Sequence, residues 1–135
     1  MKKHVKALTY KPKIDAVLSG NCSQTIRTGR NVSVGDEILF HGWSGKPYRS
    51  TWSWRMRVVV TECIDIFISE SGIDYWANYR YSNCRYLKCA WGGHACKVFA
   101  EKDFIDPPTG EALRDVLFKL NGIPKEPVHA QIIRW

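Results

Sequence analysis

A short stretch near the start of the chain carries a thiol, two hydroxyls and a guanidinium. Cys22 and Ser23 follow Gly20, and Thr25 and Arg27 come directly after them. Gly20 suits the left-handed residue that ends a helix, and in an extended segment Thr25 and Arg27 point to the same side. A polar rim between a helix end and a strand is a common way to line a pocket. We therefore take these residues as a candidate ligand-binding or catalytic site.

The role of Cys22 stays open at the level of sequence. A thiol attacks a carbonyl only as a thiolate, which needs a nearby base or positive charge. Arg27 is a candidate source of charge, whereas no histidine lies close by in the sequence. The alternative is that Cys22 is a small residue packed under the end of the helix.

Three cysteines and a histidine lie close together later in the chain. Their residue types suit a tetrahedral zinc site, and two glycines between them give the backbone room to turn. The chain has five cysteines, an odd number that favours free thiols or a metal site over a disulfide framework. The spacing matches no common zinc motif, so the two hypotheses are a structural zinc or no cofactor, with small buried cysteines. The residues concerned are Cys84, Cys89, His94 and Cys96.

Aromatic and basic side chains alternate in the same region, at Tyr79, Arg80 and Arg85 among others. Bases stack on such rings while arginines bind phosphates. The alternative is a hydrophobic cluster that holds a long loop against the body of the domain.

A second aromatic stretch, residues 52–60, alternates regularly and predicts a strand. Its tryptophans are expected to face the core. Arg55 and Arg57 lie on the opposite face, where they contact either phosphate or solvent.

The composition indicates one globular domain of 135 residues, with 44% hydrophobic residues. The formal net charge is +7, which favours polyanionic partners, although an ordinary basic surface gives the same charge. No apolar run approaches the roughly 18 residues of a membrane span, so we expect a soluble cytoplasmic protein. The sequence leaves the oligomeric state open.

Alternating and helical patterns place the elements around these residues. A helix is expected over residues 13–19, with Ile14, Val17 and Leu18 on its buried face. A second begins after Thr109, the expected N-cap, and ends at residues 121–122. Strands are expected near residues 4–10, 25–27, 37–43, 52–60, 58–68 (long and bent, or a hairpin) and 128–135.

The order of these pieces resembles the ASCH domain, a small barrel of the PUA-like group. The resemblance lies in Gly20, the Thr25-Ile26-Arg27 segment, and the Gly35-Asp36 turn that starts a strand. The run at 98–104, the amphipathic helix after residue 109 and the final strand continue it. It covers residues 1–135 except an insertion near 70–97. The resemblance implies an α+β fold, a PUA-like β-barrel with flanking helices.

The resemblance also implies recognition of RNA or a modified nucleoside, and some members of the family hydrolyse N4-acetylcytidine. In those members, a lysine, a threonine and a glutamate face one pocket. The threonine falls on Thr25, the lysine on Cys22, and the glutamate near Asp103 or Glu101. The sequence therefore predicts RNA or nucleotide-like ligand binding beside residues 20–27. The alternatives are an amidohydrolase that uses Cys22, Thr25 and Asp103, and a protein-interaction module.

Overall fold

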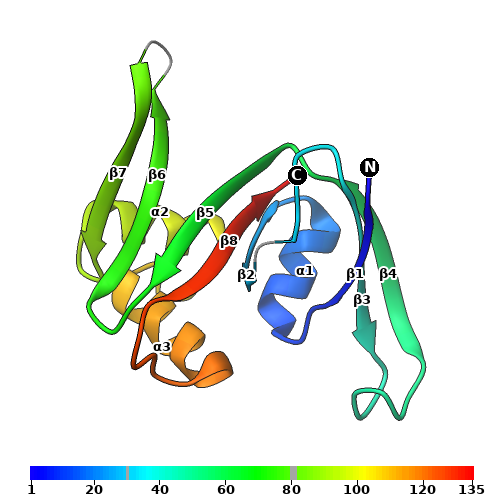
Figure 1. Cartoon of the computed structure of the whole chain (residues 1–135). Helices are drawn as coiled ribbons and strands as arrows, with labels where there is room; N and C mark the ends of the chain where they lie inside the picture. Colours follow the sequence, from blue (N-terminus) through cyan, green and yellow to red (C-terminus); the bar gives the residue numbers. More distant parts are fainter. Residues whose placement is uncertain (30, 80–81) are drawn as a thin grey trace.

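The computed structural model describes residues 1–29, 31–79 and 82–135, without the side chains of residues 76–86. Within these residues the chain forms three helices and eight strands (Figure 1). The elements are β1 (Lys3–Ala7), α1 (Lys11–Ser19), β2 (Gln24–Thr28), β3 (Glu37–Trp43), β4 (Trp52–Val59), β5 (Glu62–Ile68), β6 (Gly72–Tyr79), β7 (Ser82–Ala90), α2 (His94–Lys102), α3 (Gly110–Asn121) and β8 (Val128–Arg134).

The strands form two sheets. The smaller has the order β1-β3-β4, in which β1 runs parallel to β3, and the larger has the antiparallel order β2-β8-β5-β6-β7. Figure 1 places α1 between the two sheets, with α2 and α3 on one side of the larger sheet. The predicted α+β class is confirmed. The described strands do not join into one closed barrel.

The last strand lies between two hydrophobic cores. Ile132 of β8 packs in the core under α2 and α3, whereas its neighbour Ile133 packs in the core formed with α1 and the smaller sheet. Because side chains alternate along a strand, β8 supplies both cores. Its partner β2 pairs Thr25 with Ile133 and Ile26 with Ile132, so the side chains of β2 are divided in the same way.

Helix α1 buries only part of the face that its apolar residues predict: Val17 is buried and Ile14 packs partly against the core. Its buried residues are Lys13, Ala16 and Val17, while Leu18 is 49% exposed. The expected left-handed residue after the helix is confirmed, since Gly20 has φ 83°. Lys13 is also buried on this helix, where it has a charged partner inside the protein, as described below.

The C-terminal helix follows its sequence signals closely. Thr109 is the N-cap of α3, and its Oγ1 accepts a hydrogen bond from the Ala112 N–H at 3.2 Å. Leu113 and Leu117 are buried on the inner face. In the described part of the chain, no helix is both long and apolar enough to cross a membrane.

The region predicted as an insertion forms a hairpin, β6–β7, that extends the larger sheet and projects from the body of the domain (Figure 1). Helix α2 then begins at His94, four residues before the helical segment expected from the family resemblance. Gly93 precedes the helix and no side chain caps it, so the sequence gives little sign of this helix start.

The turn before β3 is held by one carboxylate. Asp36 is 5% exposed and accepts hydrogen bonds from the backbone N–H groups of Lys2 and Ser33, both at 3.0 Å, and lies 2.9 Å from His4 Nε2. The Lys2 N–H, the His4 ring and the Ser33 N–H hold the pKa of Asp36 well below its ordinary value near 3.8. Asp36 thereby attaches the N-terminal strand to the start of β3.

Asp36→Asn is expected to lower the stability of the protein at pH 7, because the carbonyl oxygen of the amide accepts hydrogen bonds less strongly than the carboxylate. A depressed folded-state pKa adds stability above the ordinary pKa, and this stability is lost as the pH falls toward the folded-state value. The difference between wild type and variant should therefore narrow below about pH 4. Urea unfolding from pH 7 to pH 3 measures this difference in the free energy of unfolding, with the exposed Asp115→Asn as control. If the difference in stability between wild type and Asp36→Asn did not change with pH, the stabilising role of the Asp36 carboxylate would be contradicted.

Candidate functional site

A buried ion pair joins α1 to the end of α2. Lys13 Nζ lies 2.8 Å from Asp103 Oδ1, and the two side chains are only 9% and 8% exposed. Asp103 immediately follows the last residue of α2. Buried charges of this kind are found where they are paired, and they are common at functional sites. The sequence predicted Asp103 as a candidate site residue and overlooked Lys13.

Strand β2 adds an amide to this pair. Gln24 is 1% exposed, and its Nε2 donates to the Phe99 carbonyl at 3.1 Å and to Asp103 Oδ1 at 3.5 Å. Its Oε1 accepts from Arg134 Nε at 2.9 Å, and Arg134 in turn pairs with Glu62 at 3.0 Å. A continuous polar network therefore runs from α1 through β2 to the surface of the larger sheet.

The charge state of Asp103 is set by opposing effects. Burial raises the pKa of its carboxyl, while Lys13, Gln24 and Arg27 act to lower it. A carboxyl with a raised pKa beside an amine is a group that can exchange protons nearer to neutral pH. The network is therefore chemically suited to acid–base work as well as to binding.

Thr25 and Arg27 share one face of β2, as the alternation predicts, but they are not on an exposed rim. Thr25 is 2% exposed, and Arg27 Nη2 donates to the Ala7 carbonyl at 2.6 Å. Arg27 Nε is buried without a hydrogen-bond partner in the described part of the protein. Burial lowers the pKa of Arg27 and the charge of Asp103 raises it, so the two side chains interact electrostatically.

Cys22 has the environment of a packed residue. It is 2% exposed, and its thiol donates to the carbonyls of Gln24 and Lys102 at 3.5 and 3.4 Å. Burial raises the pKa of the thiol above its ordinary value. The reactive thiolate is therefore disfavoured, which supports the packed-residue interpretation. Ser23, beside it, is exposed.

An open pocket is formed by chain neighbours of the ion pair, although neither Lys13 nor Asp103 lines it. We call it the α1–α2 pocket; it has a volume of about 410 Å³ and is formed mainly by Tyr10, Pro12, Glu101, Phe104, Ile105 and Pro108. Pro12 and Phe104 are the chain neighbours of Lys13 and Asp103, so the ion pair joins the two segments that form this pocket. Phe104 has φ 59° and is 42% exposed. Phe104 is the left-handed residue that ends α2, since its N–H donates to the Glu101 carbonyl at 3.2 Å and the Ile105 N–H donates to the Ala100 carbonyl at 3.0 Å.

A larger pocket, of about 690 Å³, lies on the other side of the first turn of α1. We call it the hairpin pocket, after the β3–β4 hairpin; it is formed mainly by Thr9, Lys11, Asp15, Trp43, Ser53 and Trp54. The prediction that the tryptophans of β4 face the core holds only in part, since Trp52 is 36% exposed.

The two predicted arginines of β4 differ in their surroundings. The Arg55 guanidinium lies 5.9 Å from the centre of the Trp52 ring. Arg57 pairs with Glu37 at 3.3 Å, although its own side chain is 65% exposed. Arg55 therefore belongs to the aromatic end of the hairpin, whereas Arg57 has an acidic partner at the surface.

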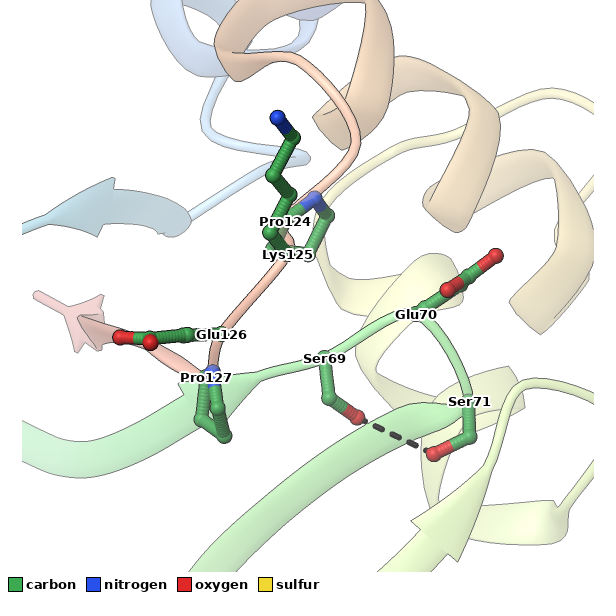
Figure 2. A pocket seen from close by; sticks show the side chains of 7 residues that line it. All are labelled: Ser69, Glu70, Ser71, Pro124, Lys125, Glu126 and Pro127. Carbon is green, nitrogen blue, oxygen red and sulfur yellow. Dashed lines mark hydrogen bonds between the residues drawn. The ribbon is translucent and has the colours of Figure 1, made fainter.

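A further pocket of about 350 Å³ lies between the β5–β6 turn and the segment that precedes β8. Figure 2 shows the Glu70 and Glu126 side chains directed to opposite sides, while Ser69 and Ser71 hydrogen-bond to each other at 3.2 Å. Paired carboxylates for catalysis require two acids that face one reacting group. This pocket lacks that arrangement.

The proposed zinc ligands are brought together only in part. The Cys96 thiol lies 3.8 Å from the Cys89 carbonyl, and the nearby Cys89 thiol contributes, after burial, to raising the pKa of Cys96 to about 12. His94 is exposed at the start of α2. Among the described residues, no group of three or more His, Cys, Asp or Glu is placed to hold a metal. The side chain of Cys84 lies outside the described residues, and the zinc site stays a prediction.

Three nucleic-acid-binding candidates also lie outside the described side chains, namely Tyr79, Arg80 and Arg85. Sequence reasoning missed Lys13, Gln24, Tyr10 and Phe104. A signal for Lys13 was present, because positions 13, 16 and 17 have helical spacing and form the face that α1 buries.

No family model, curated protein or solved structure matches this chain. The ASCH resemblance therefore stays a prediction from the residues that carry it.

Proposed function

We propose that this chain is an ASCH-type, PUA-like domain that binds a modified nucleoside, free or within RNA, in the α1–α2 pocket. The observation that carries the proposal is the buried Lys13–Asp103 pair, which is linked to Gln24 and joins the two segments that form a pocket with two aromatic rings. The Gly20–Arg27 motif contacts this pair through Gln24, whose side chain donates to Asp103.

The α1–α2 pocket has the size and lining expected of a small-ligand site. Its volume of about 410 Å³ falls within the range of roughly 300–1,000 Å³ for such sites. Tyr10 and Phe104 offer rings on which a base stacks, and the two prolines and Ile105 supply apolar contact.

In the part of the chain that the structure describes, the α1–α2 pocket is lined by two carboxylates, Glu101 and Asp106, and by no basic side chain, whereas the polar network also carries an amine. The polar edge of a base presents donors and acceptors, which Lys13, Asp103 and Gln24 can match with an ammonium, a carboxylate and an amide. In this proposal, the ligand stacks on the two rings and directs its polar edge toward the Lys13–Asp103 pair.

A second candidate function is hydrolysis of an acylated nucleoside, and one observation favours it. The amine that the family motif carries at position 22 is absent, yet Lys13 brings an amine to Asp103 from α1. In N4-acetylcytidine hydrolysis, a water oxygen bonds to the acetyl carbon and the C–N bond breaks, giving acetate and cytidine. Asp103 would accept the proton of the water and pass it to the departing nitrogen, while Lys13 stabilises the oxyanion.

Calorimetric titration with N4-acetylcytidine and cytidine tests the binding proposal. Phe104→Ala should weaken binding about 10-fold, because base–ring stacking contributes on the order of 1–3 kcal/mol. Phe104→Gly should be at least as stable as Phe104→Ala, because glycine adopts φ > 0 without strain, and it should bind equally weakly. The exposed Leu120→Ala is the control. Unchanged affinity in both Phe104 variants, or no binding by wild type, would refute the proposal.

A further inference from the structure

The end of the β3–β4 hairpin carries a row of aromatic rings that extends out of the core. The Tyr48 ring lies 5.2 Å from Trp43, Trp43 lies 6.4 Å from Trp52, and His41 stacks on Trp52 at 4.0 Å, all between ring centres. We call residues 41–55 the hairpin tip. Tyr48 is 90% exposed, so its ring contributes little to burial and is available for contact.

The loop that carries Tyr48 is ordered by its own hydrogen bonds. The Ser44 N–H donates to the Thr51 carbonyl at 2.9 Å, and the Gly45 N–H donates to Ser50 Oγ at 3.0 Å. Tyr48 has φ 62°, a conformation that is uncommon for a non-glycine residue. The tyrosine ring is therefore held outward by a defined loop, which reduces the entropy cost of binding.

The charge of the hairpin tip is of one sign. Lys46 and Arg49 flank Tyr48, Arg55 lies over Trp52, and the segment from residue 44 to residue 51 contains no acidic residue. A surface on which aromatic rings alternate with basic side chains is suited to bind single-stranded nucleic acid, since bases stack on the rings and phosphates bind the cations.

The hairpin pocket and the α1–α2 pocket lie on opposite sides of one short segment. Thr9 and Lys11 line the hairpin pocket, whereas Tyr10 and Pro12 line the α1–α2 pocket. A chain-like ligand that crosses this segment therefore reaches from the hairpin tip to the α1–α2 pocket.

We propose that the hairpin tip and the hairpin pocket bind single-stranded nucleic acid, which places one nucleoside of the strand in the α1–α2 pocket. Bases stack on Tyr48 and Trp43, and Lys46 and Arg49 contact phosphates. This inference rests on the proposed function and specifies a polynucleotide as its ligand. RNA and single-stranded DNA share the recognised chemistry.

Fluorescence anisotropy with labelled 12-residue oligouridylate and oligothymidylate tests the inference between 50 and 300 mM salt. Tyr48→Ala should weaken binding about 5- to 100-fold, and Tyr48→Gly, which removes the ring without backbone strain, should behave alike. Tyr48→Phe should retain wild-type affinity. Lys46→Ala/Arg49→Ala should reduce the slope of log affinity against log salt by about 1.4. The charge-matched control Lys119→Ala/Lys125→Ala should leave the slope unchanged.

Failure of this inference is separable from failure of the proposed function. Absence of oligonucleotide binding at 50 mM salt, binding insensitive to salt, or equal losses in the control variant would overturn the inference. N4-acetylcytidine titrated into the same hairpin variants reports on the α1–α2 pocket alone. Nucleoside binding without oligonucleotide binding would leave the proposed function standing and remove the strand path. Tighter binding of the uridylate than of the thymidylate would identify RNA as the ligand.

Discussion

Replacing Lys13 by methionine is expected to destabilise the protein by about 3–5 kcal/mol at pH 7, a large share of the stability of a small domain. The substitution preserves the length and apolar contact of the side chain but leaves Asp103 buried without its counter-charge. Urea unfolding measures the loss. Arg57→Met, which removes a partly exposed pair with Glu37, should cost less than about 1 kcal/mol.

Two results distinguish this explanation from a loss of packing. Adding Asp103→Asn to Lys13→Met should recover much of the stability, since no uncompensated charge then remains. The deficit of the single variant should also shrink as the pH falls, because burial raises the pKa of Asp103 and protonation removes the buried charge. A deficit that is unchanged in the double variant and at low pH would show that the charge is not the cause.

Under the second candidate function, Asp103→Asn is expected to lower N4-acetylcytidine hydrolysis about 100-fold or more, since a positioned acid–base group contributes at least that much. Cys22→Ala should change the rate by less than a few-fold, because the thiol is buried, donates to backbone carbonyls and has a raised pKa. The measurement is the rate of cytidine release, which chromatography monitors.

If Cys22→Ala lowered hydrolysis more than Asp103→Asn, the Cys22 thiol would be the nucleophile. Wild-type hydrolysis abolished in Cys22→Ala but retained in Asp103→Asn would contradict an acid–base role for the Lys13–Asp103 pair. Absence of hydrolysis in the wild type would leave ligand binding as the function of the pocket.

The elements that the sequence predicted best are those fixed by local chemistry. Thr109 caps α3, Gly20 adopts the left-handed conformation after α1, and residues 37–43 form β3 with the predicted bounds. Each depends on residues within one or two turns of the chain, where capping, glycine conformation and alternation act.

The site was harder to predict because its contacts are distant in sequence. Lys13 and Asp103 are 90 positions apart, and Gln24 and Arg134 are 110 apart. A lysine next to an apolar helix face is ordinarily exposed, so only the three-dimensional partner reveals that α1 turns it inward. Thr25 and Arg27 were placed on the correct face of β2, but the sequence did not reveal that the smaller sheet and α1 would bury that face.

The most direct test of the central claim is the position of the ligand. Titrating N4-acetylcytidine into ¹⁵N-labelled protein and following backbone amide shifts by NMR should perturb Tyr10, Phe104 and Ile105 first, because these residues line the α1–α2 pocket. Lys13, which follows the lining residue Pro12, should shift with them. Gln24 should shift with them through its hydrogen bond to Asp103. Shifts confined to residues 69–71 and 124–127, or no saturable shift at all, would contradict a nucleoside site at the Lys13–Asp103 pair.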